Sequence, residues 1–213
     1  MLLNKILLLA ILILLTNSTF AEEIKHNAIT QPLSVTQLAG FANYPPAVQQ
    51  IIAKAATLSE QHLTYTYGSS DPKNGGMDCS GTIFYLLKEF KVNNVPRQAN
   101  EMYEWAWKNG KFYAVNGNDF HAFEFSKLKP GDLLFWTGTY DAHREPPITH
   151  VMLYLGKNKQ DQPLMFGSSD GRTYQGKQMW GVSVFDFKLP DSKATDRFIG
   201  YSCIPNLTCQ DNI

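Results

Sequence analysis

A lone cysteine, Cys79, stands where a glycine-rich stretch gives way to a predicted helix. Apolar residues recur at i, i+3, i+4 and i+7 from Ile83 to Phe90, so the helix is expected to begin at about Cys79. Asp78 is then its N-cap, and the positive end of the helix dipole should favour the thiolate over the thiol. This pattern predicts a sulfur nucleophile. A buried, inert cysteine is the alternative, but the glycine-rich approach would let a substrate reach the sulfur.

His150 is the predicted partner of this cysteine. A thiol nucleophile needs a base, normally histidine, within hydrogen-bond reach, and a third polar group that holds the imidazole. Of the five histidines, only His150 heads a strongly apolar run, residues 151–155, whose backbone a strand would make rigid. A satisfied residue at a strand edge is the alternative. Metal binding fits less well, because neither Cys-x-x-Cys nor His-x-x-x-His spacing occurs.

Residues 1–21 have the composition of a secretory signal peptide. Lys5 precedes an unbroken apolar run over residues 6–15, and small residues stand at Thr19 and Ala21. The run is too short to span a bilayer as a helix, so a retained anchor is the weaker alternative. We expect cleavage near Ala21 and a secreted or periplasmic protein.

The charge balance excludes some classes of binding partner, and the cysteine content indicates which thiol is free. Lysine plus arginine balances aspartate plus glutamate at 19 each, so no field of one sign attracts nucleic acid or an acidic membrane. Three cysteines in an exported protein leave one unpaired if two are bridged, and Cys203 with Cys209 is the economical pair. Cys79 is then the free thiol; full reduction, or a bridge from Cys79 itself, is the alternative. We expect no cofactor, no metal, no nucleic acid and a monomeric protein.

Helices come first and short strands follow, which predicts an α+β domain. After a polar arm over residues 22–44, whose role the pattern leaves open, the catalytic domain is expected over 45–204 and a tail over 205–213. About five strands should form a meandering antiparallel sheet. Helices are expected at about 46–62, 79–90 and 98–108, and strands at 133–136, 149–155, 162–168, 181–187 and 198–204.

Several short motifs along the chain carry a family resemblance. They are Tyr67-Gly68, Asp78-Cys79-Ser80-Gly81 at the start of a helix, Pro96-Arg97, the run from Leu128 to Trp136, and Thr149-His150 before the strand that ends at Gly156. In this order they resemble the NlpC/p60 family of papain-like cell-wall cysteine endopeptidases, over residues 47–204. The resemblance implies a papain-like (NlpC-type) fold with the nucleophile helix packed on the sheet. It also implies hydrolysis of amide bonds in peptidoglycan stem peptides, typically between D-glutamate and a diamino acid.

The resemblance assigns roles to single residues by position. Cys79 is the nucleophile and His150 the base, Tyr67 and Asp78 flank the site, and Ser80 lines it. An amide or acyl transferase of the same fold, or a non-catalytic cell-wall-binding module, is the alternative to a peptidase.

The third polar residue departs from the family pattern. The family usually has a histidine on the strand after the catalytic histidine, and aligning residues 164–169 there puts Phe166 in its place. Ser168 shares a strand face with Phe166 and is the predicted substitute, directly or through water. A backbone carbonyl is the alternative.

The segment from Thr137 to Ile148 is too long for a minimal hairpin and leads directly into His150, so we expect it to border the cleft. Arg144 in this segment, together with Arg97, is a candidate to pair with carboxylates of the stem peptide, because a guanidinium fork suits that task better than a lysine. An exposed arginine without function is the alternative.

Overall fold

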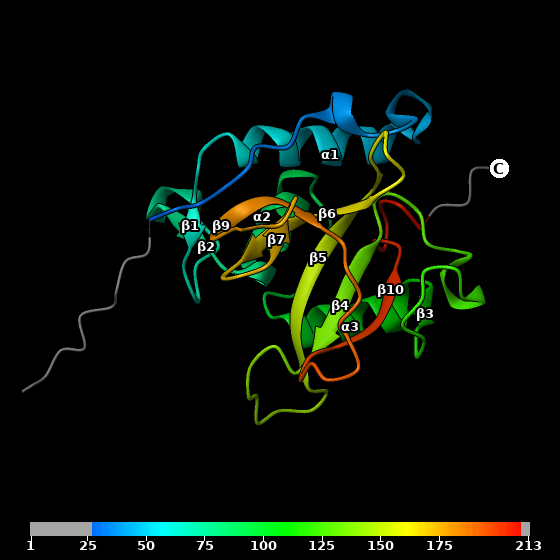
Figure 1. Cartoon of the computed structure of the whole chain (residues 1–213). Helices are drawn as coiled ribbons and strands as arrows, with labels where there is room; N and C mark the ends of the chain where they lie inside the picture. The colour runs from blue at the N-terminus through cyan, green and yellow to red at the C-terminus, as the bar shows by residue number, and fades with distance from the viewer. Residues whose placement is uncertain (1–26, 210–213) are drawn as a thin grey trace, which may run out of the picture.

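The computed structural model describes residues 27–209, so the predicted signal peptide lies outside the described residues (Figure 1). The three predicted helices are confirmed as α1 (Pro46–Ser59), α2 (Cys79–Glu89) and α3 (Ala99–Asn109). Short 3-10 turns occur at η1 (Val35–Gln37), η2 (Phe41–Asn43), η3 (Pro72–Asn74) and η4 (Phe123–Phe125). No helix in this part of the chain is long and apolar enough to cross a bilayer.

An antiparallel sheet of six strands forms the centre of the described chain. In spatial order its strands are β3 (Phe112–Ala114), β10 (Arg197–Ser202), β4 (Leu133–Thr137), β5 (Ile148–Lys157), β6 (Pro163–Ser169) and β9 (Gly181–Asp186). The five predicted strands and the α+β class are confirmed. The three-residue edge strand β3 was missed because so short a segment shows no alternation. Two small pairs complete the strands, β1 (Thr64–Tyr65) with β2 (Gly76–Met77), and β7 (Thr173–Tyr174) with β8 (Lys177–Gln178).

One face of the sheet, the helix face, packs against α2 and α3, which lie behind the sheet in Figure 1. Phe135 lies opposite Val151, and Leu153 opposite Phe166, so these four side chains share this face. Phe135 contacts Tyr103 of α3 edge-on, with 5.7 Å between ring centroids. All four are fully buried, and each such side chain contributes about 1.5–3 kcal/mol to folding.

The opposite face, the aromatic face, carries Trp136 and, across from it on β5, His150. Trp136 packs edge-to-face on Phe187 and Phe198, with centroids 5.8 and 5.0 Å away. Aromatic pairs in this geometry add to the stabilisation from burial alone. The rings therefore give His150 a dry and rigid support.

The described part of the N-terminal arm is tied to the domain at several places. Ile29 pairs with Trp180 in an isolated bridge, the amide of Leu33 donates to the Ser59 hydroxyl at 2.8 Å, and Leu38 pairs with Asn158. Leu33 and Leu38 are buried. The arm thus belongs to the folded unit, a question that the sequence pattern had left open.

The predicted disulfide joins Cys203 to Cys209, and Cys79 is a free, buried cysteine. Both expectations are confirmed. The bridge closes a short loop just after β10, so it constrains only the last described residues.

Asp132, at the turn into β4, gives a prediction about stability and pH. Burial raises the pKa of its carboxyl to about 7, although the carboxyl accepts the Lys129 amide at 2.8 Å. In the unfolded chain an aspartate titrates near pH ~4, so the folded state holds the extra proton between these values. Stability is therefore lost as the pH rises from about 4 through 7. Thermal unfolding measured between pH 5 and pH 8 should show that Asp132→Asn loses less stability than the wild type. If stability falls equally with pH in both proteins, the prediction is wrong.

Candidate active site

Asp78 organises the start of α2, as predicted for an N-cap. One carboxylate oxygen accepts the Gly81 amide at 2.6 Å and the other accepts the Gly68 amide at 2.8 Å. A Cβ at Gly81 would lie 2.1 Å from the carbonyl oxygen of Ser69, so only glycine lets the loop pack this closely on the helix. The cap fixes Cys79, the next residue, in a defined orientation.

Arg97 is fully engaged with this cap. Its two terminal nitrogens donate to the two carboxylate oxygens of Asp78 at 3.0 and 2.8 Å, and one also donates to the Ser80 hydroxyl at 3.0 Å. The expectation that Arg97 pairs with a substrate carboxylate is therefore corrected, because its fork already holds a carboxylate of the protein. Arg97 positions the nucleophile loop instead.

The thiol of Cys79 lies against strand β5 on both sides of His150. Its sulfur is 3.9 Å from the carbonyl oxygen of Thr149, and it also accepts a hydrogen bond from the Val151 backbone. The structure thus brings the predicted nucleophile and base to adjacent positions, although they are far apart in the chain.

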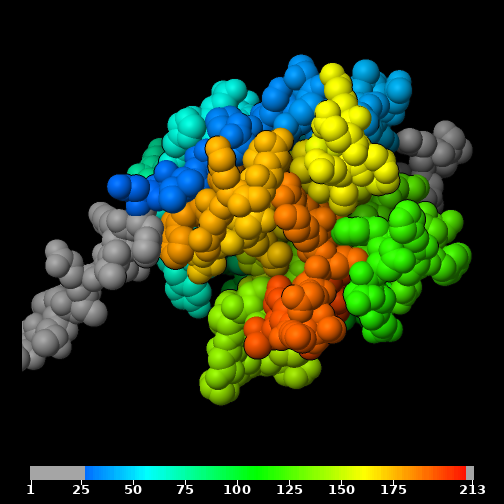
Figure 2. Space-filling model, in the orientation of Figure 1, coloured from blue at the N-terminus to red at the C-terminus, as the bar shows by residue number. Residues whose placement is uncertain are grey.

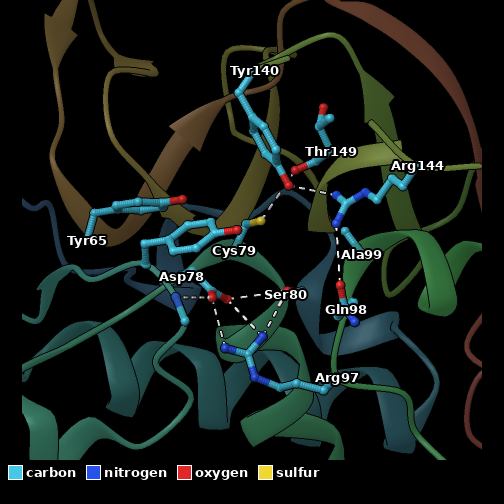
Figure 3. A pocket seen from close by; sticks show the side chains of 12 residues that line it. Tyr65, Asp78, Cys79, Ser80, Arg97, Gln98, Ala99, Tyr140, Arg144 and Thr149 are labelled. Carbon is cyan, nitrogen blue, oxygen red and sulfur yellow. Dashed lines mark hydrogen bonds and ion pairs between the residues drawn. The ribbon is translucent and has the colours of Figure 1, made fainter. Parts of the chain in front are cut away.

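The thiol opens into a cavity of about 230 Å³, the nucleophile cavity (Figure 3). Its lining residues are Tyr65, Tyr67, Gly68, Asp78, Cys79, Ser80, Arg97, Gln98, Ala99, Tyr140, Arg144 and Thr149. Tyr67 is 73% exposed at its rim, so it flanks the site as expected. Tyr65 was missed by sequence reasoning, yet its hydroxyl points toward the sulfur in Figure 3. Tyr65 stands two residues before Tyr67, and residues two apart in an extended segment share a side, so this spacing was the signal available.

The segment from Thr137 to Ile148 borders this cavity, as predicted. Arg144 donates to the Tyr140 hydroxyl at 2.7 Å and to the carbonyl of Ile148 at 2.6 Å, which holds both side chains over the cavity (Figure 3). The hydroxyl of Thr149 accepts the Thr139 amide at 3.1 Å, so the segment is anchored to β5.

His150 is buried on the aromatic face. Its ring meets Trp136 edge-on at 5.8 Å, and its Nε2 atom is buried without a hydrogen-bond partner. The imidazole lines a second cavity of about 290 Å³, the histidine cavity, which shares Tyr65, Tyr140 and Thr149 with the nucleophile cavity. The two cavities therefore adjoin at these three shared residues, with Cys79 lining the first cavity and His150 the second.

The resting pair is a neutral thiol beside a neutral imidazole. Burial and the Asp78 carboxylate raise the pKa of Cys79 to about 11, while burial and the Arg172 guanidinium hold the pKa of His150 well below its usual value. The expectation of a stabilised thiolate is thus wrong for this state, because loss of solvent outweighs the helix dipole. Among the described residues no hydrogen bond links the thiol to the imidazole, and such contacts often tighten only when substrate binds.

A model of the NlpC/P60 family matches residues 62–179. This range contains Cys79, His150 and the two arginines that line the nucleophile cavity, Arg97 and Arg144. The chain belongs to the NlpC/P60 family.

Three known proteins are similar to part of this chain. The chain is 32% identical over 120 residues to murein DD-endopeptidase MepH of Escherichia coli, which is 54% of this chain and 36% of MepH. It is 34% identical over 99 residues to the probable endopeptidase YafL of the same organism, covering 46% of this chain and 33% of YafL. It is 26% identical over 131 residues to gamma-DL-glutamyl hydrolase of Bacillus subtilis, covering 58% of this chain and 26% of that protein. The matched segments thus span about a third or less of these relatives.

The register of β6 corrects the prediction that Ser168 is the third polar residue of the site, the one that holds the imidazole. Phe166 lies opposite Leu153 on the helix face, and Ser168 follows it there by alternation, whereas His150 lies on the aromatic face. The Ser168 hydroxyl donates to the carbonyl of Met77 at 2.6 Å. Ser168 therefore does not orient the imidazole.

Alternation puts Gly167 and Ser169 of β6 on the aromatic face with His150. A Cβ at Gly167 would lie 2.4 Å from the sulfur of Met152, two residues after His150 on β5, so methionine fills the space that a side chain at this position would need. Ser169 lines the histidine cavity with His150, but among the described residues no hydrogen bond joins the two side chains, and the Nε2 atom of His150 is buried without a partner.

The neutral thiol leads to a prediction about alkylation. Because burial raises the pKa of Cys79 to about 11, the thiolate fraction is small at neutral pH and grows with pH. Iodoacetamide should therefore modify Cys79 slowly at pH 6 and progressively faster above pH ~9. Mass spectrometry of the modified peptide follows the rate, and denatured protein, with an ordinary cysteine, is the control. Rapid modification of the folded protein at pH 6 would contradict a neutral resting thiol.

Proposed function

We propose that this chain is an exported cysteine peptidase that hydrolyses amide bonds in peptidoglycan stem peptides. Membership of the NlpC/P60 family and the names of two relatives, a murein DD-endopeptidase and a gamma-DL-glutamyl hydrolase, support the substrate class. The observation that carries the proposal is the contact of the Cys79 sulfur with the backbone on both sides of His150, in a region where two cavities share Tyr65, Tyr140 and Thr149.

The chemistry proceeds through an acyl-enzyme. His150 accepts the thiol proton of Cys79 as the sulfur attacks the scissile carbonyl carbon, and the tetrahedral oxyanion forms. The Tyr65 hydroxyl, which points toward the sulfur, is placed to donate a hydrogen bond to this oxyanion (Figure 3). When the intermediate collapses, the C–N bond breaks and the leaving amine takes the proton from His150. Water, deprotonated by His150, then attacks the thioester, which releases the acid and restores the thiol.

The scissile bond that we propose joins D-glutamate, through its γ-carboxyl, to a diamino acid. The name of MepH favours a second candidate, the D-alanyl bond of a peptide crosslink. Digestion of purified peptidoglycan, followed by mass spectrometry of the fragments, separates the two, because the first cut shortens stem peptides and the second only splits crosslinked dimers. Intact peptidoglycan after digestion with folded protein would reject both.

A transferase of the same chemistry differs only in the acceptor of the acyl group. If an added amine is acylated in preference to water, the peptidase proposal fails in favour of a transferase. Export is supported by the composition of residues 1–21 and by the bridge between Cys203 and Cys209, since disulfides persist in oxidising compartments. Fractionation of cells that express the full chain tests the location.

Arg144 is the arginine of the nucleophile cavity that remains available to a substrate, and we expect it to pair with a carboxylate on the acyl side of the bond. Arg144→Gln should raise KM about 5-fold for a substrate that carries this carboxylate, the range of a partly solvated ion pair. The matching amide substrate should be unaffected. Steady-state kinetics on both substrates decide the point, and equal effects would argue against the pairing.

A further inference from the structure

A further cavity, of about 390 Å³, lies where strand β4 begins. The loop that leads to His150 leaves the other end of β4, so this cavity and the active site are at opposite ends of the strand (Figure 1). Figure 2 likewise shows the green segment before β4 and the yellow-green loop before β5 on separate sides of the visible face. None of the residues that line this cavity lines the nucleophile or the histidine cavity.

Three lysines from two segments line this cavity, which we call the lysine cavity. Lys111 comes just before β3, while Lys127 and Lys129 lie on the turn into β4. The side chains of Lys127 and Lys129 form no hydrogen bond and no ion pair within the described residues. The balanced charge of the whole chain gave no sign of such a place, because the fold and not the composition gathers these lysines.

The first turn of helix α1 adds to this positive charge. Pro45 and Val48 belong to the cavity wall, and this helix start has neither a side-chain cap nor an acidic residue in its first turn. The positive end of the helix dipole is therefore not compensated there. The turn into β4 packs directly on α1, since a Cβ at Gly131 would lie 3.0 Å from the Val48 side chain.

Asp132 is the one acidic residue among those that line the lysine cavity, and it is only 5% exposed. One of its carboxyl oxygens accepts the Lys129 amide, and within the described residues the other has no hydrogen-bond partner. Burial raises the pKa of this carboxyl to about 7. Below that pH it carries a proton that it can donate to an anion, and above it the carboxylate repels one.

Lys129, Tyr154 and Tyr201 act on the Asp132 carboxyl. Burial raises the pKa of both tyrosines, so near neutral pH only the lysine among these three is charged. The ionisation of Asp132 is therefore the change that alters the charge of this cavity between pH 6 and pH 8.

The chemistry of the lining favours phosphate over carboxylate. An ammonium is a point charge, and it lacks the planar fork with which arginine matches a carboxylate. Among the described residues no arginine lines this cavity. A phosphate group presents several oxygens in different directions, so lysines from separate segments and a helix N-terminus can reach it together. The Tyr113 side chain, also part of the lining, brings a further hydroxyl donor.

We propose that the lysine cavity binds a phosphate group and serves as an anchoring site away from the active site. The ligand class is a phosphate ester, and a phospholipid headgroup and a soluble phosphate ester share this chemistry. The inference goes beyond the proposed function and is independent of it, because the lysine cavity contains neither Cys79 nor His150.

Titration of the purified full chain with inorganic phosphate at constant ionic strength, followed by the NMR signals of the Gly131 and Asp132 amides, tests the site. The double variant Lys127→Gln/Lys129→Gln should bind phosphate at least about 10-fold more weakly, the effect of losing hydrogen bonds to charged groups. The matched control is Lys159→Gln/Lys177→Gln, which removes two exposed charges outside the cavity and should bind like the wild type. Equal weakening in the two double variants, or no saturable binding by the wild type, would overturn the proposal.

Asp132→Asn should change phosphate binding in the opposite direction. At pH 8 the variant lacks the carboxylate that repels the anion, so it should bind phosphate at least about 3-fold more tightly than the wild type. At pH 6, where the wild-type carboxyl is protonated, the two proteins should bind alike. Each comparison is made at one pH, so the protonation of phosphate itself cancels. No difference at pH 8 would place the phosphate elsewhere and reject the site.

Vesicles distinguish the two sources of the phosphate group. Sedimentation with vesicles of phosphatidylcholine that contain phosphatidylglycerol, but not with pure phosphatidylcholine, would identify a lipid headgroup if Lys127→Gln/Lys129→Gln abolishes it. Binding of inorganic phosphate without sedimentation would identify a soluble phosphate ester. Cys79→Ala should bind phosphate like the wild type, so the result holds even if the chain hydrolyses no peptide.

Discussion

Replacing Cys79 by alanine is expected to abolish hydrolysis of cell-wall fragments, with a loss of at least about 10⁴-fold in kcat, because no acyl-enzyme can form without the sulfur. The fold should survive, since the change removes only the buried sulfhydryl group next to the Thr149 carbonyl. Release of stem-peptide fragments, measured by chromatography and mass spectrometry, gives the rate. Thermal unfolding of the same preparation shows whether the fold is kept.

Cys79→Ser is the matched control for this variant. It keeps the size and the hydrogen-bonding capacity of the side chain, but a hydroxyl is a far weaker nucleophile beside a base whose pKa is lowered. Both variants should be inactive and stable. Substantial turnover by Cys79→Ala would remove the thiol mechanism altogether.

The parts of the site that are local in sequence could be predicted from the sequence. Asp78 caps α2 and Cys79 follows it because short-range spacing determines a helix start. His150 was found because a polar ring before an apolar strand is conspicuous. The edge strand β3 and the tie between Ile29 and Trp180 depend on pairings between distant segments, which local patterns do not contain.

Three features of the site depend on long-range packing, and here the sequence misled. The dipole argument favoured a thiolate at Cys79, but burial is a property of the whole fold and raises its pKa. The Arg97 fork is filled by Asp78 from another segment. Ser168 was chosen by counting from an assumed alignment, and an error of one residue moves a side chain to the other face of the sheet.

His150→Gln is expected to reduce kcat/KM by about 10²- to 10⁴-fold, the range for loss of a general acid and base. Glutamine is polar and of similar length, so the packing against Trp136 should be largely kept. The pH profile supplies a second measurement. Because the pKa of His150 is held below its usual value, the base form persists in mild acid, and the acidic limb of the wild-type kcat/KM profile should lie below pH ~6.5.

His143→Gln is the matched control, since its side chain is 93% exposed on the loop that precedes β5 and pairs only loosely with Asp141 at 3.7 Å. It should retain wild-type activity and the wild-type pH profile. An inactive His143→Gln beside an active His150→Gln would exchange the two assignments. An acidic limb that survives in His150→Gln would mean that another group accepts the thiol proton, and that the imidazole on the aromatic face only supports the strand.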